Sequence, residues 1–473
     1  MIALLLLIPT VCGGLAFVMR NDSQRRWMLL IASAAHLALT VAVLAVPTPP
    51  ADGAWFGLDA LGRLFLGITS LLFLASSVYS VEYLRTHRGR QDVYVGCMLF
   101  FLAAMTMVTV SQHFGALWIA VEATTLASAP LIYFSRDVSS LEAMWKYLLI
   151  CSVGIALALL GNFFLAAAFA SDGQAPMSLS ALRQSAGASS TIWLKAAFIC
   201  FIVGYGTKMG LAPMHSWLPD AHSESPSPVS ALLSGALLNC AFLGILRAMQ
   251  VCESAGLGDF SRDLMLDFGL LSMGFAAVFI VRQSNFKRLL AYSSVEHMGI
   301  LALGVGLGGG GDFGALLHAV NHSLTKAMLF LLAGNIIEAY HTKSTWRVRG
   351  MIRTIPITGA LWVAGLLAIT GSPPFGPFLS ELTILRASLD QGRPVVAAAY
   401  LAILALIFIA MAEVFLKMAQ GDPEPDRKRE KESLWTLVPP IILGVGVLTL
   451  GVYVPPWLND LLHAAASSLG GAS

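Results

Sequence analysis

The chain has 473 residues, of which 57% are hydrophobic and only 12% are charged, and its formal net charge at pH 7 is +2. A soluble domain of this length could not bury so large a fraction of hydrophobic residues, so the composition indicates a polytopic membrane protein. The small net charge, without a basic stripe interleaved with aromatic residues, excludes nucleic acid as a partner.

Apolar stretches of roughly twenty residues, separated by polar or Pro/Gly-rich breaks, predict about fourteen transmembrane helices. Only helices and closed barrels satisfy the backbone in lipid, and these stretches lack the period-two alternation of barrel strands, so the predicted fold class is all-α. The first stretch lacks a charged n-region and a small-residue cleavage site, and is expected to be a retained span rather than a signal peptide. The predicted spans are residues 1–19, 28–46, 59–81, 93–111, 113–134, 143–170, 192–212, 228–250, 264–281, 288–307, 312–339, 356–387, 395–418 and 434–454.

Positive charge alternates between the predicted loops. The loops after odd-numbered spans are rich in arginine and lysine, whereas the opposite loops hold little beyond Arg183, Arg262 and Arg393. By the positive-inside rule the former are cytoplasmic, which places both termini on the outer side of a bacterial-type inner membrane. The positive clusters are Arg20, Arg25 and Arg26; Arg85, Arg88 and Arg90; Arg136; Arg282, Lys287 and Arg288; Lys343, Arg347, Arg349 and Arg353; and residues 427–431.

The sequence offers no recognisable cofactor site. Its cysteines contain no Cys-x-x-Cys pair and no spacing that suits zinc or an iron–sulfur cluster, so they are read as small core residues. A Gly-x-Gly-x-x-Gly pattern at Gly304, Gly306 and Gly309 lies at the end of an apolar helix, where a nucleotide site would need a preceding strand. The chain is therefore expected to carry no cofactor, metal or catalytic centre of its own.

Several ionisable residues lie inside the predicted spans. A charged side chain at the centre of a bilayer is costly, so by default such residues mark an ion pathway or a proton relay. A structural polar contact between helices is the alternative for any single one of them. They are Glu122 in the fifth span, Lys208 in the seventh, Glu296 and His297 in the tenth, His318, His322 and Lys326 in the eleventh, Glu381 in the twelfth, and Glu413 and Lys417 in the thirteenth.

The eleventh span repeats a polar residue every four positions. His318, His322 and Lys326 therefore project from nearly the same face of one helix, a turn apart. Two histidines at this spacing also occur in zinc proteases, but that motif needs a glutamate after the first histidine, where this chain has Ala319. A proton relay suits the lysine better, because an ammonium is a poor metal ligand.

Two spans contain helix breakers at membrane depth. Pro213 follows Lys208 closely, and residues 371–377 read Gly-Ser-Pro-Pro-Phe-Gly-Pro shortly before Glu381. Irregular backbone is tolerated there only where it is buried in protein or lines a hydrated cavity. Breaks beside a charge in two halves of a chain are also what an internally duplicated transporter would show.

Four segments carry a family resemblance. The most specific is the stretch from Lys208 to His222, which reads Lys-Met-Gly-Leu-Ala-Pro-Met-His-Ser-Trp-Leu-Pro-Asp-Ala-His; the others are residues 118–130, 287–299 and 318–330. Together they resemble the antiporter-like subunits of respiratory complex I, of multi-subunit cation/proton antiporters and of membrane-bound hydrogenases. The likeness spans roughly residues 60–420. The sequence Glu-Ala-Thr-Thr-Leu after Val121 is most similar to the F-type component of hydrogenase-4 complexes.

This resemblance implies a fold with two inverted five-helix repeats, in which the seventh and twelfth helices are broken. The implied organisation is an N-terminal group of three helices (1–92), a first repeat (93–250), a second repeat (264–418), and a last helix with a short tail (434–473).

The resemblance also implies roles for single residues. Glu122 would pair with Lys208, Lys326 would be the central lysine, His322 a relay histidine, and Glu381 the terminal group. His318 belongs to the same relay, and the secondary members are His222, Glu296 and His297. The family usually has a bridging lysine or histidine on the eighth helix, whereas this chain has Ser234 and Asn239, so the middle of the relay is expected to depend on Asn239 and water.

Three functions remain open from the sequence. The first is a proton-translocating membrane subunit of a redox-driven complex, with other membrane subunits and a peripheral electron-transfer module as partners. The second is a subunit of a multi-subunit cation/proton antiporter, or of an ion-coupled uptake system, that needs no electron transfer. The third is a non-conducting helical scaffold, for which the altered eighth helix is the best argument.

Overall fold

The computed structural model describes residues 1–46, 50–87, 89–170, 176–422 and 429–470. Across these residues the regular structure is helical, apart from three isolated β-bridges between loops. Three of the predicted cytoplasmic charges, Arg88, Arg427 and Lys428, lie outside the described residues.

In the described part of the chain, twelve helices are long and apolar enough to cross a membrane, by length and composition. They correspond to twelve of the predicted spans; the other two predictions fall on α1 (Ile2–Val18) and α16 (Pro356–Ile369), which are shorter apolar helices. The twelve are α2 (Asp22–Ala45), α3 (Ala60–Thr86), α4 (Gln91–Val110), α5 (Phe114–Ile132) with its 3₁₀ extension to Ser135, α6 (Val138–Ala168), α8 (Thr191–Met209), the continuous run Ser227–Ser254, α12 (Gly258–Ile280), α13 (Phe286–Leu307), α14 (Gly310–Tyr340), α18 (Pro394–Gln420) and α19 (Leu434–Val452).

Because of helix caps, several helices begin before the apolar stretches that were predicted from the sequence. The predicted span 28–46 begins at Asp22 because Asn21 caps the helix by accepting a hydrogen bond from the backbone of Ser23 at 2.8 Å. The predicted span 143–170 begins at Val138, where Asp137 and Ser140 form a capping box. The structure adds short helices that hydropathy does not reveal: α7 (Leu179–Gln184), α9 (Trp217–Glu224), α15 (Met351–Thr354) and α20 (Pro456–Ser467).

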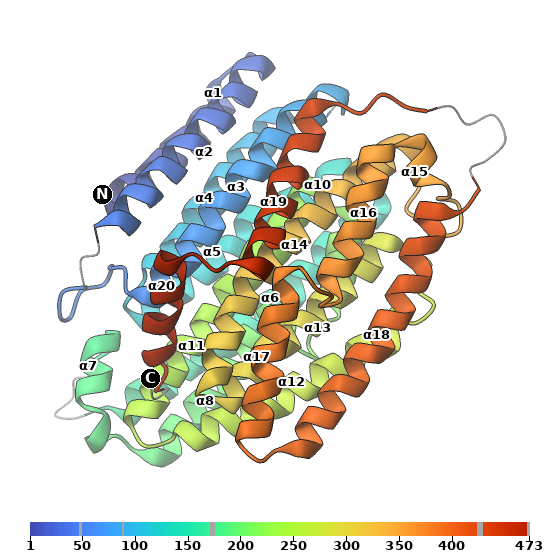
Figure 1. Cartoon of the computed structure of the whole chain (residues 1–473). Helices are drawn as coiled ribbons and strands as arrows, with labels where there is room; N and C mark the ends of the chain where they lie inside the picture. The colour runs from blue at the N-terminus through green and yellow to red at the C-terminus, as the bar shows by residue number, and fades with distance from the viewer. Residues whose placement is uncertain (47–49, 88, 171–175, 423–428, 471–473) are drawn as a thin grey trace.

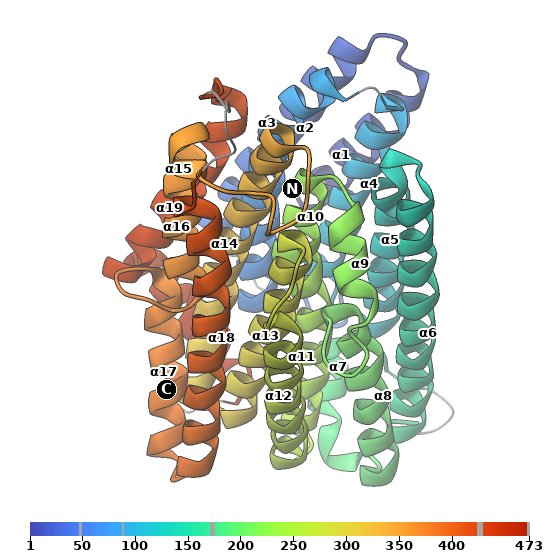
Figure 2. The same cartoon turned by 90° about the vertical axis from the view of Figure 1, so that its right-hand side faces the viewer.

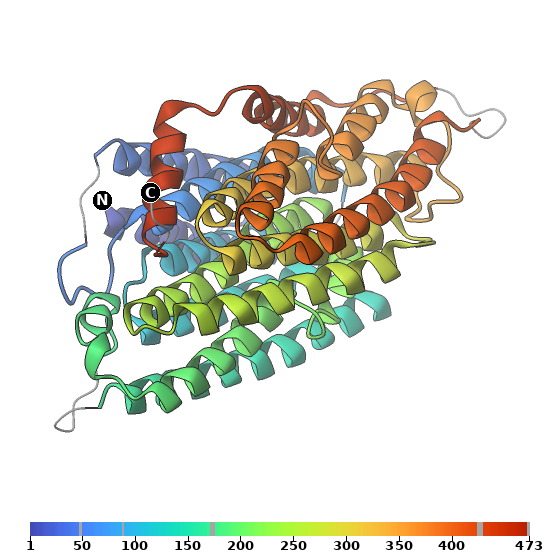
Figure 3. The same cartoon turned by 60° about the horizontal axis from the view of Figure 1, so that its bottom comes forward.

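The long helices lie side by side in one bundle (Figures 1 and 2). In Figure 2, α6 and α8 lie on one side, α17 (Gly376–Asp390) and α18 lie on the other, and α11 (Leu238–Ser254) and α13 lie between them. In Figure 3 the yellow-green central helices again lie between the green and teal helices and the orange helices. The run Ser227–Ser254, α13 and α14 are buried along their apolar windows, so the core lies along these central helices.

Both predicted breaks are present. Helix α8 ends at Met209, Gly210 takes a left-handed φ of 85°, and α9 begins at Trp217. The carbonyls freed by this break are satisfied: Trp217 Nε1 donates to Thr207 O at 2.8 Å and Leu211 N donates to Gly206 O at 2.9 Å. The second break separates α16 from α17, and Ser372 N donates there to Leu367 O at 2.8 Å.

The central run Ser227–Ser254 contains a π-helical segment, Leu233–Leu237, between α10 (Ser227–Leu232) and α11. Such bulges are rare inside α-helices and frequently occur at functional sites. Gly235 lies in this segment against α14, where a Cβ atom would come within 3.0 Å of the carbonyl oxygen of Ser323. The absence of a side chain at Gly235 therefore lets the two central helices approach each other closely.

Candidate functional site

Most of the ionisable residues predicted inside the spans are buried within the bundle. Lys208 and Lys326 are fully buried, as are the histidines at 222, 297, 318 and 322, and Asn239, Glu296 and Glu381 are buried to more than nine-tenths. Glu122 is only partly buried. Glu413 and Lys417 pair with each other four residues apart at the surface of α18 and are not part of this group.

Lys208 at the end of α8 is held by two hydroxyls. Its ammonium donates to Thr125 Oγ1 and to the Tyr147 hydroxyl, each at 2.7 Å, and lies 4.6 Å from the centre of the Tyr147 ring. A cation over an aromatic ring gains further electrostatic stabilisation. The site thus compensates the buried charge without a carboxylate in direct contact.

The direct pair expected between Glu122 and Lys208 is not formed in this structure. Thr125 donates instead to Glu122 Oε2 at 3.3 Å, and Ser152 donates to Glu122 Oε1 at 3.0 Å. A hydroxyl can accept one hydrogen bond while it donates another, so Thr125 connects the ammonium to the carboxylate. Glu122 and Lys208 are therefore connected through one side chain, because Thr125 lies one turn after Glu122 on α5 and occupies the space between the carboxylate and the ammonium.

Asn239 and the π-helical segment connect α11 to the next two helices. Asn239 Nδ2 donates to Ser323 Oγ on α14 at 2.7 Å and to Gly235 O at 2.9 Å. Ser234 Oγ and Ser294 Oγ on α13 are 2.8 Å apart. Hydroxyls and an amide therefore occupy the middle of the row of buried polar residues that runs from Glu122 and Lys208 through Lys326 to Glu381.

Lys326 on α14 is also bound by neutral acceptors. Its ammonium donates to Leu290 O at 2.7 Å and to the hydroxyl of Ser293, both on α13. Glu296, two turns further along α13 than Leu290, is the carboxylate that acts electrostatically on Lys326. Glu296 Oε2 has no hydrogen-bond partner among the described residues, so this acid is not locked in place.

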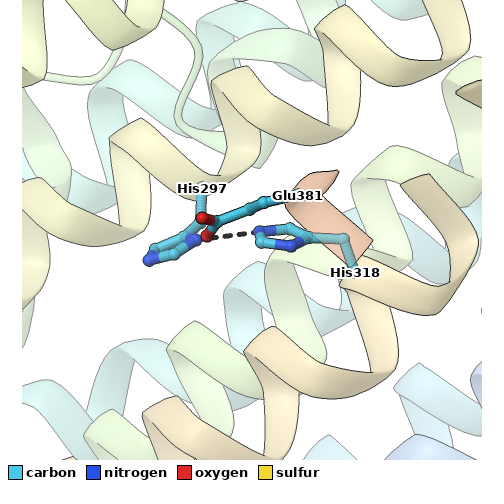
Figure 4. Close-up of side chains that lie close together, drawn as sticks. All are labelled: His297, His318 and Glu381. Atoms are coloured by element: carbon cyan, nitrogen blue, oxygen red, sulfur yellow. Dashed lines mark hydrogen bonds between the residues drawn. The ribbon is translucent and has the colours of Figure 1, made fainter. Parts of the chain in front are cut away.

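The row ends in a cluster of imidazoles and a carboxylate where α13, α14 and α17 meet. His297 Nδ1 and His318 Nε2 are 2.9 Å apart, and His318 Nδ1 lies 2.9 Å from Ser380 Oγ. Glu381 follows Ser380, and Figure 4 shows its carboxylate pointing toward the two imidazole rings. The His322 ring lies 5.0 Å from the His297 ring, centre to centre, without a hydrogen bond between them.

This arrangement changes the predicted polar face of α14. His318 and His322 both flank His297, whereas Lys326 turns to Leu290 and Ser293. Along their own helix the His318 and His322 rings are stacked 6.4 Å apart, centre to centre, but no hydrogen bond joins the three residues directly. Side chains of α13 and α17 supply the links between them.

Two imidazoles and one carboxylate are also the donor set of many zinc sites. One ligand atom from each of His297, His318 and Glu381 lies within 4.8 Å of the others. One nitrogen of each ring is already used in the hydrogen bond between the rings, and His318 uses its other nitrogen with Ser380. The geometry is thus that of a hydrogen-bonded chain, although these residues are the ones that could hold a metal ion.

Sequence reasoning missed the hydroxyls that join the charged groups. Thr125 was detectable, because it follows Glu122 by three residues and so lies on the same helical face. Ser293 and Ser294 were also detectable, because they precede Glu296 within residues 287–299, one of the segments that carry the family resemblance. Nothing in the sequence pointed to Tyr147, which lies 61 residues from Lys208 and meets it only through the packing of α6 on α8.

The geometry can be compared with known proteins. A family model described as "NADH:quinone oxidoreductase/Mrp antiporter, TM" matches residues 111–408. The chain is 33% identical over 470 residues to "Hydrogenase-4 component F homolog" of Methylacidiphilum infernorum (isolate V4), and the match covers 96% of both proteins.

Solved structures resemble the whole chain. One chain of the membrane-bound sulfane sulfur reductase, an archaeal respiratory membrane complex, superposes with a TM-score of 0.89 at 21% identity, covering 99% of this chain and 98% of that one. A chain of the Mrp complex from Dietzia sp. DQ12-45-1b gives a TM-score of 0.88 at 20% identity, covering 99% and 97%. At these identities the likeness shows the fold.

Proposed function

Because this multi-pass membrane protein belongs to the NADH:quinone oxidoreductase/Mrp antiporter transmembrane family, we propose that it translocates protons as a membrane subunit of a redox-driven complex of the hydrogenase-4 type. The observation that carries the proposal is the row of buried polar side chains that runs across the bundle from Glu122 on α5 to Glu381 on α17. Groups of this kind are costly to place inside a membrane, and by default they mark an ion path.

The row contains alternating groups that can take up or release a proton. Glu122 and Lys208 share Thr125, Lys326 lies between neutral acceptors, and His297 and His318 lead to Glu381. Asn239 and the paired hydroxyls of Ser234 and Ser294 occupy the middle, where water completes the connection. Imidazoles suit the later steps because one ring nitrogen can accept a proton while the other donates one.

Electrostatic coupling between Glu122 and Lys208 would drive the first step. The carboxylate supports the buried ammonium, and when it moves away Lys208 releases its proton toward Lys326 and His322. Moving one charge outward against a potential of about 100 mV needs about 2.3 kcal/mol, so a modest change in this interaction is sufficient. A partner module that transfers electrons to quinone or protons would supply the energy.

The finer architecture belongs to the same proposal. The segments 93–250 and 264–418 form two inverted five-helix repeats, each with a broken helix beside a charge: Lys208 near the α8–α9 break and Glu381 after the α16–α17 break. With α1 and the α16–α17 pair counted as spans, the chain crosses a bacterial-type inner membrane fourteen times, and the termini face outward.

Purification in mild detergent with native partners, followed by mass spectrometry, tests the assembly. Recovery of hydrogenase or quinone-oxidoreductase subunits is the expected result. Recovery with small antiporter subunits alone would favour the second candidate, a cation/proton antiporter without electron transfer. The likeness to a chain of the Mrp complex supports that candidate.

Proton pumping by the assembled complex tests the residues. In inside-out vesicles, Glu122→Gln and Lys208→Met should abolish acidification of the lumen while assembly is retained, because each removes one member of the Thr125-linked pair. The matched control is Lys417→Met, which removes an exposed lysine paired with Glu413 outside the row. Normal pumping by Lys208→Met would contradict the assigned role.

A further inference from the structure

A polar cavity of about 470 Å³ opens at the end of the bundle where the loops with positive charges gather. In Figure 1 this is the end that carries α15. Its walls include the carboxylates of Glu82, Asp137, Glu224, Glu338 and Glu432 and the imidazole of His87. A polar space of this size holds on the order of fifteen water molecules, at about 30 Å³ each. The residues of the buried row are not among those that line the cavity.

Lys287 forms part of the inner wall of this cavity. It is the second residue of α13, it is 1% exposed, and its ammonium donates to Ser225 O at 2.6 Å. Lys343 nearer the rim is paired with Glu224 at 2.8 Å, whereas no described carboxylate lies within ion-pair distance of Lys287. A buried ammonium bound to a carbonyl, at the end of a hydrated space, is unusual for a purely structural lysine.

Polar contacts continue inward from Lys287 to the start of α10. Ser225 Oγ lies 2.7 Å from Ser230 Oγ, and Ser230 Oγ donates to His222 O at 3.1 Å. The His222 ring is fully buried and stacked on Phe330 at 4.8 Å, and neither ring nitrogen has a hydrogen-bond partner in the described part of the chain. An unpartnered buried imidazole needs either water or a transient partner.

His222 precedes Ser223, which lines the cavity, and its ring stacks on Phe330, one turn after Lys326 on α14. Lys326 is bound to Leu290 O, and Leu290 follows Lys287 by three residues on α13, which is about 4.5 Å along the helix axis. Inward from the cavity the structure therefore offers Lys287 in the wall and His222 beside the part of α14 that carries Lys326. These groups come from α13, α9 and α14, and the α9–α10 turn brings them together.

We propose that this cavity is a proton-uptake vestibule, and that Lys287 and His222 carry protons from it to Lys326. The inference rests on the proposed function and gives the row an entrance on the side of the positive loops. A hydrated proton in the cavity protonates the neutral amine of Lys287, the ammonium passes that proton to one nitrogen of His222, and the imidazolium releases its other N–H proton to Lys326. The number of protons is conserved, and no oxidant or reductant takes part.

Substitutions of Lys287 separate proton carrying from charge anchoring. Arginine keeps the positive charge but does not release a proton in proteins, whereas histidine titrates readily. In inside-out vesicles of the whole complex, Lys287→Met and Lys287→Arg should each lower pumping per electron transferred at least tenfold. Lys287→His should retain a third or more of the wild-type rate. The control Lys417→Met removes an exposed lysine of α18 outside the cavity and should stay within twofold of wild type.

The outcomes distinguish this inference from the function on which it rests. If the wild-type complex does not pump, or if Lys208→Met still pumps, the proposed function fails before Lys287 is considered. If Lys208→Met abolishes pumping while Lys287→Met pumps as wild type, the vestibule is wrong and the proposed function stands. If Lys287→Arg pumps normally and Lys287→Met does not, Lys287 anchors the Ser225 carbonyl and carries no proton.

Cysteine labelling checks the cavity without relying on Lys287. Thr436 lines the cavity and is partly exposed, so Thr436→Cys should react with a membrane-impermeant thiol reagent in inside-out vesicles and not in right-side-out cells. Leu126→Cys, on the exposed apolar face of α5, is the unreactive control, and the wild type gives the background of the native cysteines. No reaction at Thr436→Cys from either side would overturn the proposal.

Discussion

Thr125 occupies the position that decides how Lys208 and Glu122 communicate. It accepts from the ammonium at 2.7 Å and donates to the carboxylate at 3.3 Å, so one hydroxyl takes part in both contacts. The neighbouring Thr124 is equally buried, but its hydroxyl donates to Val121 O within its own helix. Two adjacent threonines of α5 thus have different roles, and only one of them bridges helices.

Thr125→Val should slow proton pumping about tenfold or more. The substitution keeps the shape of the side chain but removes a hydrogen bond to a charged group, and such bonds contribute about 1.5–3 kcal/mol. The measurement is the rate of lumen acidification per electron in inside-out vesicles. Thr124→Val is the matched control, and equal rates for the two variants would mean that Glu122 reaches Lys208 by another route.

The π-helical segment sets the spacing between the central helices. Leu233–Leu237 brings Ser234 to Ser294 on α13 and places Gly235 against Ser323 on α14. One extra residue in a helical turn re-aims the side chains that follow it, which is how Asn239 reaches Ser323. The element therefore determines which polar groups meet in the middle of the row.

Gly235→Ala should lower both stability and pumping. A Cβ atom there would lie 2.5 Å from Leu72 Cδ1 and 3.0 Å from Ser323 O, so the helices must separate. Overpacking of this kind costs about 1–3 kcal/mol, and the separation stretches the Asn239–Ser323 hydrogen bond. Thermal unfolding in detergent and pumping in vesicles measure the two effects. Gly274→Ala, where a Cβ atom meets nothing within 4 Å, should change neither property. If Gly235→Ala unfolds and pumps as the wild type does, the spacing between the helices is adaptable.

The whole bundle is tied together by contacts between parts of the chain that are distant in sequence. Arg247 on α11 is 2% exposed and forms a bidentate pair with Asp59, which caps α3. Gln250 on the same helix donates to Ser468 Oγ at 3.0 Å, and Arg262 donates to Leu469 O at 2.7 Å. These bonds attach both the N-terminal helices and the C-terminal segment to the central helices.

Arg247→Met should lower the free energy of unfolding by about 3 kcal/mol, because removing one partner leaves the Asp59 carboxylate partly buried without its cation. Thermal unfolding of the purified chain in detergent measures the effect. Arg386→Met breaks the exposed Arg386–Asp390 pair of α17 and should change stability by less than about 1 kcal/mol. If the double variant Asp59→Asn, Arg247→Met is no more stable than the single variant Arg247→Met, the unpaired carboxylate is not the cause of the lost stability.

Much of the helical layout could be predicted from the sequence. Lipid forces the backbone to satisfy itself within each helix, so apolar length locates the spans, and Pro213 and residues 371–377 locate the breaks. Hydropathy does not register caps, which is why α2 and α6 begin several residues before the apolar stretches do. It also passes over the short helices α7 and α20.

The sequence by itself determined that this protein is an all-α membrane protein and pointed to most of the ionisable residues in the buried row, because composition, apolar length and the cost of charge in lipid are properties that each segment carries alone. Only the tertiary structure decided which groups meet. Lys208 binds Thr125 and Tyr147 rather than Glu122, and Lys326 binds Ser293 and Leu290 of a neighbouring helix. The physical reason is that a hydrogen bond forms only over about 3 Å, and side chains far apart in sequence come within that distance only when the helices pack against one another.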